Sequence, residues 1–232
     1  MRILIQLVAI DIDGTLTFRD RKLDLTAVEA VRKAEASGLS VVLATGNVLT
    51  FAEAASIMLG TSGLLIVEDG GIVFDRSTGE KHVLGDRLEA DRGLAALERT
   101  FGPLEQTRSS AERLTGLTLK RTISVEDVRK VLQREGFSLV AVDSGFAIQI
   151  KSLEVNKGNA LRKVSSISRV PMAEIAAIGD GPNDIEMLSA AGVSFAVANS
   201  TDEVKRVCTH VTTSPYGKGA AEAIESILSL RQ

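Results

Sequence analysis

The chain has 232 residues, of which 44 % are hydrophobic and 25 % are charged, and its formal net charge is −3. This length allows one or two domains, and the balance is typical of a globular protein. The slight acidity argues against a nucleic-acid or membrane-surface binder, and no apolar run approaches the ~18 residues of a membrane-spanning helix. The single cysteine, Cys208, excludes an internal disulfide and fits a reducing compartment. We therefore expect a cytoplasmic protein without nucleic-acid or membrane partners.

The first predicted element ends in two acids. The run from Leu7 to Ile10 is apolar throughout, which is typical of a strand buried on both faces of a parallel sheet. Asp11 and Asp13 follow it, and alternation along an extended chain lets both side chains point to one side. Two carboxylates ~4 Å apart repel by about 4 kcal/mol at an effective dielectric near 20. Such a pair is stable when a cation lies between the acids or when one of them carries a proton. The alternative interpretation is an ordinary turn at the end of a strand, with both acids solvated.

The elements that follow predict a doubly wound parallel sheet. Thr26 and Glu29 suggest a capping box at the start of a helix that ends at Gly38. Strand, helix and strand then alternate with short links, a pattern typical of α/β folds. The further elements expected in this part of the chain are a strand at 40–44, a helix to residue 59, a strand at 64–67, a helix at 156–166, a strand at 175–178, a helix at 185–191, strands at 193–197 and 210–212, and a helix at 219–230.

A different pattern interrupts this alternation. Two strands around a turn are expected at 72–74 and 81–84, and then helix, strand, helix, strand and strand. The second of these helices is expected to start at Ser124 and to stop at Gly136. The last two strands, 138–142 and 146–150, flank Asp143-Ser144-Gly145, which is a hairpin signal. We therefore predict an α/β core domain of residues 1–84 and 153–232 with an inserted small α+β domain of residues 85–152.

Polar side chains follow three of the predicted core strands. Because the carboxyl ends of parallel strands meet at one edge of an open α/β sheet, these side chains are expected to lie together. Carboxylate, hydroxyl and amide oxygens form a hard site that favours Mg²⁺ and offers nothing that zinc prefers. The residues are Asp11, Asp13, Thr45, Gly46, Asn47, Asp180, Asn183 and Asp184. Lys157, in the first turn of the helix after the insert, is either an anion-binding residue or a surface lysine.

Four short motifs stand in the order found in the haloacid dehalogenase superfamily of phosphatases. They are Asp11-Ile12-Asp13-Gly14-Thr15-Leu16, Thr45 at a second strand end, Lys157, and the GDGPND run of residues 179–184. Each is weak alone, but the four in order make the whole chain resemble this superfamily. The short insert resembles the type C2B cap of the Cof-like branch. Its size, the run at 45–47 and the ending YGKG at 216–219 resemble the archaeal phosphoglycolate phosphatases, whereas EDGG at 68–71 departs from the ENGG often seen there.

The resemblance implies a Rossmann-like core with a cap and a Mg²⁺-dependent phosphatase. Asp11 would attack phosphorus and become an aspartyl phosphate, because a carboxylate can do so once charge is neutralised. Asp13 would protonate the leaving alkoxide and then accept a proton from water. Asp11, the backbone carbonyl of Asp13, Asp180 and Asp184 would hold Mg²⁺.

The resemblance also assigns the phosphate-binding residues. Thr45, with the backbone N–H groups of Gly46 and Asn47, would hold the phosphoryl oxygens, and Lys157 would neutralise charge. Asn183 would orient Lys157 or the metal shell.

The expected substrate is a small phosphorylated acid, first of all 2-phosphoglycolate, which would give glycolate and phosphate. The alternatives are a sugar-phosphate or broad-specificity phosphatase, a phosphomutase, and a receiver-like module that is phosphorylated on Asp. Asp13 and the insert argue against the receiver. For the oligomeric state, the sequence allows both a monomer and a homodimer. The insert's basic residues either meet a substrate carboxylate or are solvated surface charges; they are Arg108, Arg113, Lys120 and Arg121.

Overall fold

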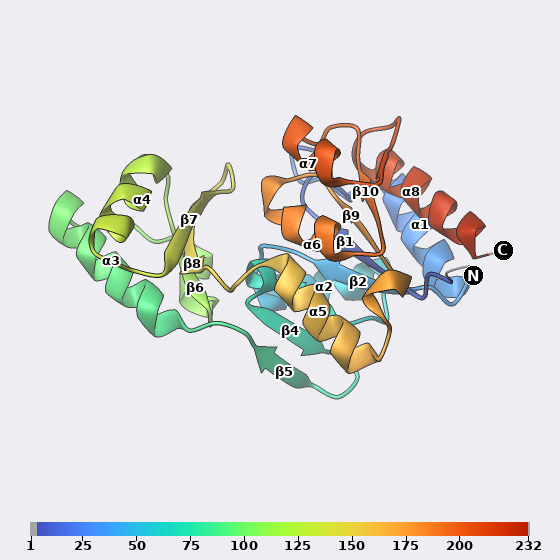
Figure 1. The fold of residues 1–232 in the computed structure, drawn as a ribbon, viewed down its shortest axis with the longest axis horizontal. Helices are drawn as coiled ribbons and strands as arrows, with labels where there is room; N and C mark the ends of the chain where they lie inside the picture. The colour runs from blue at the N-terminus through green and yellow to red at the C-terminus, as the bar shows by residue number, and fades with distance from the viewer. Residues whose placement is uncertain (1–3, 232) are drawn as a thin grey trace. The chain divides into compact units, whose positions relative to one another are not determined.

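The computed structural model of the chain describes residues 4–231. It divides into two compact units, Met1–His82 with Asn156–Gln232 and Val83–Val155 (Figure 1). We name them the core unit and the insert unit. The insert expected at 85–152 lies inside the second unit. No helix within the described part of the chain is long and apolar enough to cross a membrane.

An eight-stranded sheet runs through the core unit. Its strands are β1 (Leu7–Asp11), β2 (Ser40–Ala44), β3 (Leu65–Val67), β4 (Ile72–Asp75), β5 (Glu80–Val83), β9 (Ile175–Gly179), β10 (Val193–Ala196) and β11 (His210–Val211). Their order is β11-β10-β9-β1-β2-β3-β4-β5. β1 pairs in parallel with β2 and β9, β10 pairs in parallel with β9 and β11, and β2 pairs in parallel with β3, whereas β3 and β4 are antiparallel. The apolar runs of β1 and β9 are fully buried because both faces of the sheet are covered.

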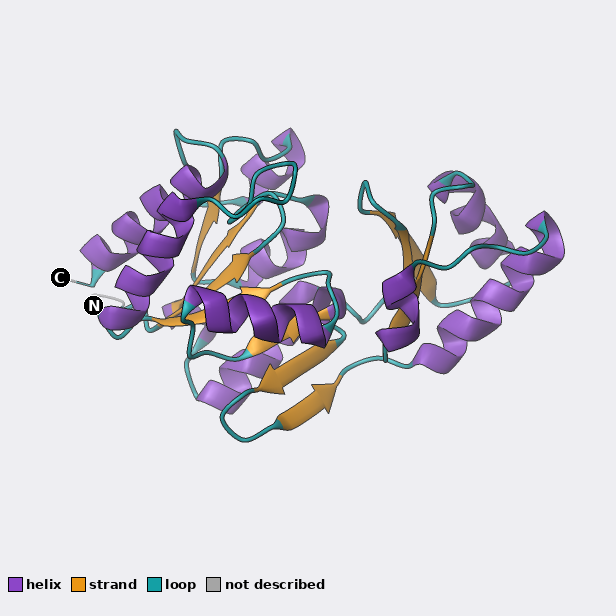
Figure 2. Ribbon diagram, turned by 180° about the vertical axis from the view of Figure 1, so that it is seen from behind, coloured by secondary structure: helices purple, strands orange, loops and turns teal. Residues whose placement is uncertain are grey.

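Helices lie on both faces of this sheet (Figure 2). They are α1 (Leu25–Ala36), α2 (Leu49–Leu59), α5 (Lys157–Ser168), α6 (Ile185–Ala190), α7 (Asp202–Val207) and α8 (Tyr216–Leu230). α1 and α8 lie side by side (Figure 1) and share one hydrophobic cluster with α2 and the strands. α5 packs against α6. The predicted doubly wound α/β architecture is therefore confirmed, whereas α7 was not predicted.

The predicted start of α1 was wrong. The N-cap is Asp24, whose carboxylate accepts a hydrogen bond from the Thr26 backbone N–H at 2.9 Å. Thr26 lies inside the first turn, where its hydroxyl cannot satisfy the first free N–H groups of the helix. Both residues are good cap formers, so the local pattern placed the start two residues late.

The insert unit has its own small sheet and hydrophobic cluster. Its elements are α3 (Arg87–Phe101), β6 (Gly116–Leu119), α4 (Val125–Arg134), β7 (Leu139–Asp143) and β8 (Ile148–Ser152). The three strands are antiparallel in the order β6-β8-β7, and one sheet face packs on α3 and α4. The predicted cap of α4 is confirmed, because the Ser124 hydroxyl accepts from the Asp127 N–H at 3.1 Å.

Candidate active site

The strand register brings the predicted polar residues to one edge of the core sheet. Asp11, the last residue of β1, is level with Ala44, the last residue of β2. Thr45, the residue that follows β2, therefore lies just beyond the level of Asp11. β9 pairs with β1 on its other side and ends at Gly179, so Asp180 enters the same edge. This edge is where ligands bind in open α/β sheets.

Lys157 is the centre of a buried charged cluster, which we define as Asp11, Lys157, Asp180 and Asp184. Its Nζ donates to Asp11 Oδ1 and to Asp184 Oδ1, each at 2.6 Å. Lys157 and Asp184 are 0 % exposed and Asp11 is 4 % exposed. Buried charges persist only when they are paired. Lys157 is thus a buried cation between two carboxylates, which rules out the surface-lysine interpretation.

The turn after β9 is folded around Asp184. Its second oxygen, Oδ2, accepts from the backbone N–H groups of Asp180 and Gly181, each at 3.0 Å. A Cβ on Gly179 would lie 2.7 Å from that oxygen, and a Cβ on Gly14 would lie 2.4 Å from Asp180 Oδ2. Only glycine allows this approach, and Gly14 also has a φ of +92°. The glycines of both motifs therefore let the acidic groups pack together.

Three carboxylates of the charged cluster are close enough to hold a metal ion. Asp11, Asp180 and Asp184 each offer an oxygen, and these atoms lie within 4.8 Å of one another. Asp11 Oδ2 is buried and has no hydrogen-bond partner among the described residues. Such an unpartnered buried oxygen, in a set of hard oxygen donors, fits a divalent cation. The expected ligand at residue 13 is its backbone carbonyl, which stays a prediction.

The electrostatics of the cluster also favour a cation. Burial, followed by the negative charge of Asp184, raises the pKa of the Asp11 carboxyl well above its ordinary value. The same two causes raise the pKa of Asp180 to about 7. Burial disfavours the charge on Lys157, but the Asp11 and Asp184 carboxylates outweigh it and raise the pKa of this ammonium above its usual value. The cluster thus has more negative charge than Lys157 alone neutralises.

Asp13 has different surroundings, although it is two residues from Asp11. Its side chain is 27 % exposed. Its Oδ1 accepts from Arg21 Nε at 2.8 Å, and its Oδ2 accepts from Asn47 Nδ2 at 2.7 Å. Asn47 Nδ2 also donates to Thr45 Oγ1 at 2.9 Å. Asp13, Asn47 and Thr45, predicted from separate motifs, are therefore brought together.

Not every predicted phosphate-binding group is placed as expected. The Asn47 backbone N–H donates to Thr45 Oγ1 at 3.1 Å. Gly46 lies between these two residues, and its role stays a prediction. Asn183 donates to Asp69 Oδ1 at 2.9 Å instead of to Lys157. Asp69 in turn adds to the negative field that raises the pKa of Lys157.

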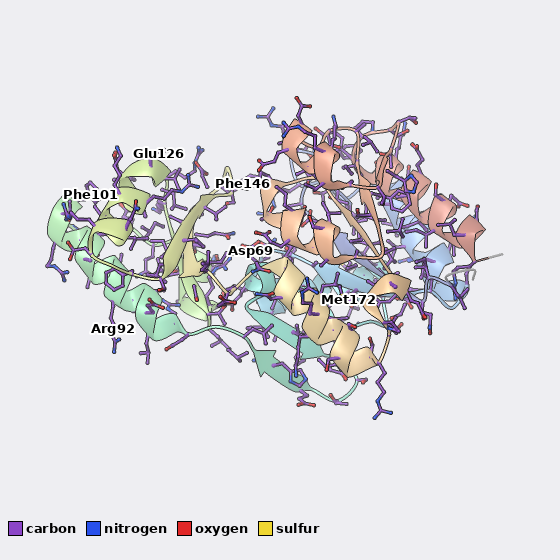
Figure 3. The ribbon with its side chains drawn as sticks, in the orientation of Figure 1. Asp69, Arg92, Phe101, Glu126, Phe146 and Met172 are labelled. Atoms are coloured by element: carbon purple, nitrogen blue, oxygen red, sulfur yellow. The ribbon has the colours of Figure 1, made fainter. Side chains whose placement is uncertain are left out.

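The turn that carries Asp69 has an unusual backbone. Asp69, labelled in Figure 3, follows β3 and is fully buried. Glu68, Asp69 and Gly70 all have left-handed φ values, +53°, +55° and +96°. A Cβ on Gly70 would lie 2.1 Å from the carbonyl oxygen of Asn156, the N-cap of α5. Left-handed non-glycine residues cost about 1–3 kcal/mol and cluster at functional sites. This turn therefore packs closely on the residue before Lys157.

Comparison with known proteins gives the family. A model of the haloacid dehalogenase-like hydrolases matches residues 8–98 and 105–224. The chain belongs to this family. The predicted resemblance to the haloacid dehalogenase superfamily and the predicted assignment as an enzyme are therefore confirmed. The four motifs that carry the candidate active site lie inside the matched segments.

Relatives of similar length cover nearly the whole chain. One, "Phosphoglycolate phosphatase" of Methanothermobacter thermautotrophicus, is 37 % identical over 221 residues, which cover 95 % of this chain and 98 % of the relative. Another with the same name, from Archaeoglobus fulgidus, is 39 % identical and covers 97 % of each chain. Among solved structures, Thermoplasma acidophilum 0175 has a TM-score of 0.88 at 30 % identity and covers 98 % of this chain and 99 % of that one.

Two of the insert's four basic candidates have partners within the insert unit. Lys120 pairs with Glu105, and Arg121 Nη2 lies 2.9 Å from Asp143 Oδ2. Arg113 is 8 % exposed and Arg108 begins a 3₁₀ turn. The pairs of Lys120 and Arg121 fit the interpretation of these two residues as surface charges.

Two residues of the site were missed by sequence reasoning. Arg21 lies in a loop without periodicity and gave no signal. Asp69 follows the end of a strand, as the other acids of the site do, and this position could have identified it as a site residue.

Proposed function

We propose that this hydrolase is a Mg²⁺-dependent phosphatase that acts on a small phosphomonoester, with 2-phosphoglycolate as the first candidate. The observation that carries the proposal is the pairing of Asp11 with the buried Lys157 in the charged cluster, while Asp13, two residues away and outside the cluster, is partly exposed. The names of relatives at 37 % and 39 % identity support the choice of substrate.

In the first half-reaction, Asp11 attacks phosphorus. The bond between Asp11 and phosphorus forms while the ester P–O bond breaks. Asp13, as a carboxylic acid, gives its proton to the leaving oxygen, so that the alcohol departs and an aspartyl phosphate remains. Lys157, held on Asp11 Oδ1, offsets the repulsion between the carboxylate and the phosphate.

In the second half-reaction, Asp13 acts in the opposite direction. It takes a proton from a water molecule as that water attacks phosphorus. The bond from phosphorus to Asp11 breaks, inorganic phosphate is released, and both acids return to their starting states. Asp13 suits this exchange because its side chain is partly exposed, whereas Asp11 is buried.

The metal ion would be held by Asp11, Asp180, Asp184 and the backbone carbonyl of Asp13. When bound, Mg²⁺ supplies positive charge to the substrate phosphate and to the acids. The raised pKa values of Asp11 and Asp180 and the unpartnered Asp11 Oδ2 support this placement.

The phosphoryl oxygens would be held by the fully buried Thr45, by Gly46 and by Asn47, together with Lys157. Asn183 would act on Lys157 through Asp69, which it contacts directly.

The test is phosphate release from 2-phosphoglycolate with Mg²⁺, beside a panel of sugar and nucleoside phosphates. We expect a strong preference for 2-phosphoglycolate that is lost with EDTA. Similar kcat/KM values across the panel would leave the chemistry intact but replace the substrate with a broad set of small phosphates. No release from any substrate, together with a long-lived phosphoryl group on Asp11, would favour the receiver-like module.

A further inference from the structure

Arg21 is held in place by a tight loop between β1 and α1. Thr17 and Leu23 form an antiparallel bridge at the base of this loop. The Phe18 N–H donates to the Lys22 carbonyl and the Arg21 N–H donates to the Phe18 carbonyl, both at 2.9 Å. Arg21 has a φ of +66°, a left-handed conformation that costs a non-glycine residue about 1–3 kcal/mol. The fold therefore keeps an arginine at a backbone position that favours glycine.

The Arg21 side chain is fixed by groups from three segments. Nε donates to Asp13 Oδ1 at 2.8 Å, and Nη2 donates to Asn47 Oδ1 at 3.2 Å. The guanidinium carbon lies 5.7 Å from the ring centroid of Phe51 on α2, within cation–π range. A simple surface ion pair between Arg21 and Asp13 would require neither the hydrogen bond to the Asn47 amide nor the contact with the aromatic ring of Phe51.

These contacts close a ring of three side chains, Asp13, Arg21 and Asn47. Arg21 uses the amide oxygen of Asn47, and the amide nitrogen donates to Asp13 Oδ2 at 2.7 Å and to Thr45 Oγ1 at 2.9 Å. Among the described residues, Arg21 and Asn47 are the only hydrogen-bond donors to the Asp13 carboxylate. Each oxygen therefore depends on one donor, and the plane of the carboxyl group is set by both.

We propose that Arg21 is a positioning residue for Asp13. It orients the Asp13 carboxyl group toward the leaving oxygen and, through Asn47, keeps that group aligned with Thr45. The inference rests on the proposed function, because the acid role of Asp13 belongs to it. Its consequence is that loss of Arg21 weakens proton delivery, so the damage depends on how much the leaving group needs a proton.

The experiment compares kcat/KM for two substrates, because this ratio reports the steps up to departure of the leaving group. A strongly basic alkoxide, as in 2-phosphoglycolate, needs the proton, whereas p-nitrophenolate leaves without it. In Arg21→Met we expect kcat/KM for 2-phosphoglycolate to fall about 30-fold and that for p-nitrophenyl phosphate less than about 3-fold. Arg21→Lys, which restores a donor to Asp13, should recover part of the loss for 2-phosphoglycolate.

Arg19→Met is the matched control. Arg19 belongs to the same exposed loop and has no hydrogen bond or ion pair with a described residue. It should leave both substrates within about 2-fold, as an ordinary surface substitution does. An equal loss for both substrates in Arg21→Met, or no loss for either, would overturn the inference and assign Arg21 a structural role or none.

A double-mutant cycle gives an independent readout. In an Asp13→Ala background, Arg21→Met should change kcat/KM for p-nitrophenyl phosphate by less than about 2-fold, because the group that Arg21 positions is gone. A further large loss would show that Arg21 acts by another route. If the wild-type protein releases no phosphate from any ester, the proposed function fails and this inference fails with it; if wild type is active, the Arg21 variants judge the inference alone.

Discussion

Asp11 and Asp13 are separated by one residue, yet the structure surrounds them in opposite ways. Asp11 is 4 % exposed and shares a fully buried lysine with Asp184. Asp13 is 27 % exposed at its side chain, and its partner Arg21 is 40 % exposed. One acid is therefore held by charge neutralisation in a dry environment, and the other by the hydrogen-bond geometry of the Asp13–Arg21–Asn47 ring.

The two environments have different energetic consequences. Removing one partner of a buried ion pair leaves an uncompensated charge and costs about 3–5 kcal/mol, whereas an exposed pair contributes about 0–1 kcal/mol. Changes in the charged cluster should therefore alter activity and stability together. Changes in the ring should alter activity and leave stability nearly unchanged.

The largest expected effect is the loss of the nucleophile. Asp11→Asn keeps the shape of the side chain but removes its negative charge, so we expect kcat to fall at least about 1,000-fold with an unchanged far-UV circular dichroism spectrum. Asp20→Asn, at an exposed acid of the following loop, is the control and should keep wild-type activity. Normal turnover in Asp11→Asn would contradict the proposed chemistry.

Removal of Lys157 should have the largest effect on stability. Lys157→Met leaves Asp11 and Asp184 buried without their shared cation, and the free energy of unfolding should fall by about 3–5 kcal/mol. Urea unfolding measures this loss. Lys163→Met is the matched control, because Lys163 lies on the same helix and pairs with no described residue. Equal stability of the two variants would mean that burial of Lys157 carries no energetic weight.

The charged cluster should also make the metal-free protein sensitive to pH. The pKa of Asp180 is raised to about 7, so the folded state binds more protons than the unfolded state between about pH 4 and pH 7. The free energy of unfolding should therefore fall as pH rises through 7, by roughly 2–4 kcal/mol between pH 5 and 8 in EDTA. Excess Mg²⁺ at pH 8 should reverse the loss because it binds the folded state. Higher stability at pH 8 than at pH 5 without metal would contradict this assignment.

The charged cluster was largely predictable from the sequence, and the ring was not. Strands buried on both faces read as short apolar runs, and the carboxyl ends of parallel strands meet at one edge. Those two rules place Asp11, Thr45 and Asp180 together from the sequence alone. The order of motifs added Lys157.

The remaining contacts depend on long-range geometry. Arg21 reaches Asn47, 26 residues away, from a turn whose left-handed φ no periodicity predicts. Asn183 meets Asp69 across 114 residues, and the strained turn at Asp69 is set by its packing against the start of α5. Local patterns indicate strands and their ends, but they do not determine which loop side chains meet.

The smallest expected stability effect sharpens the comparison of the two acids. Asn47→Ala removes the donor to Asp13 Oδ2 and to Thr45 Oγ1 from a partly exposed position, so it should lower the free energy of unfolding by only about 1 kcal/mol. Because the Asp13 carboxyl group and the Thr45 hydroxyl both lose their alignment, kcat/KM should still fall about 10- to 100-fold. Urea unfolding and phosphate release on the same preparation separate the two effects. A stability loss near that of Lys157→Met would show that the ring, like the charged cluster, holds the core unit together.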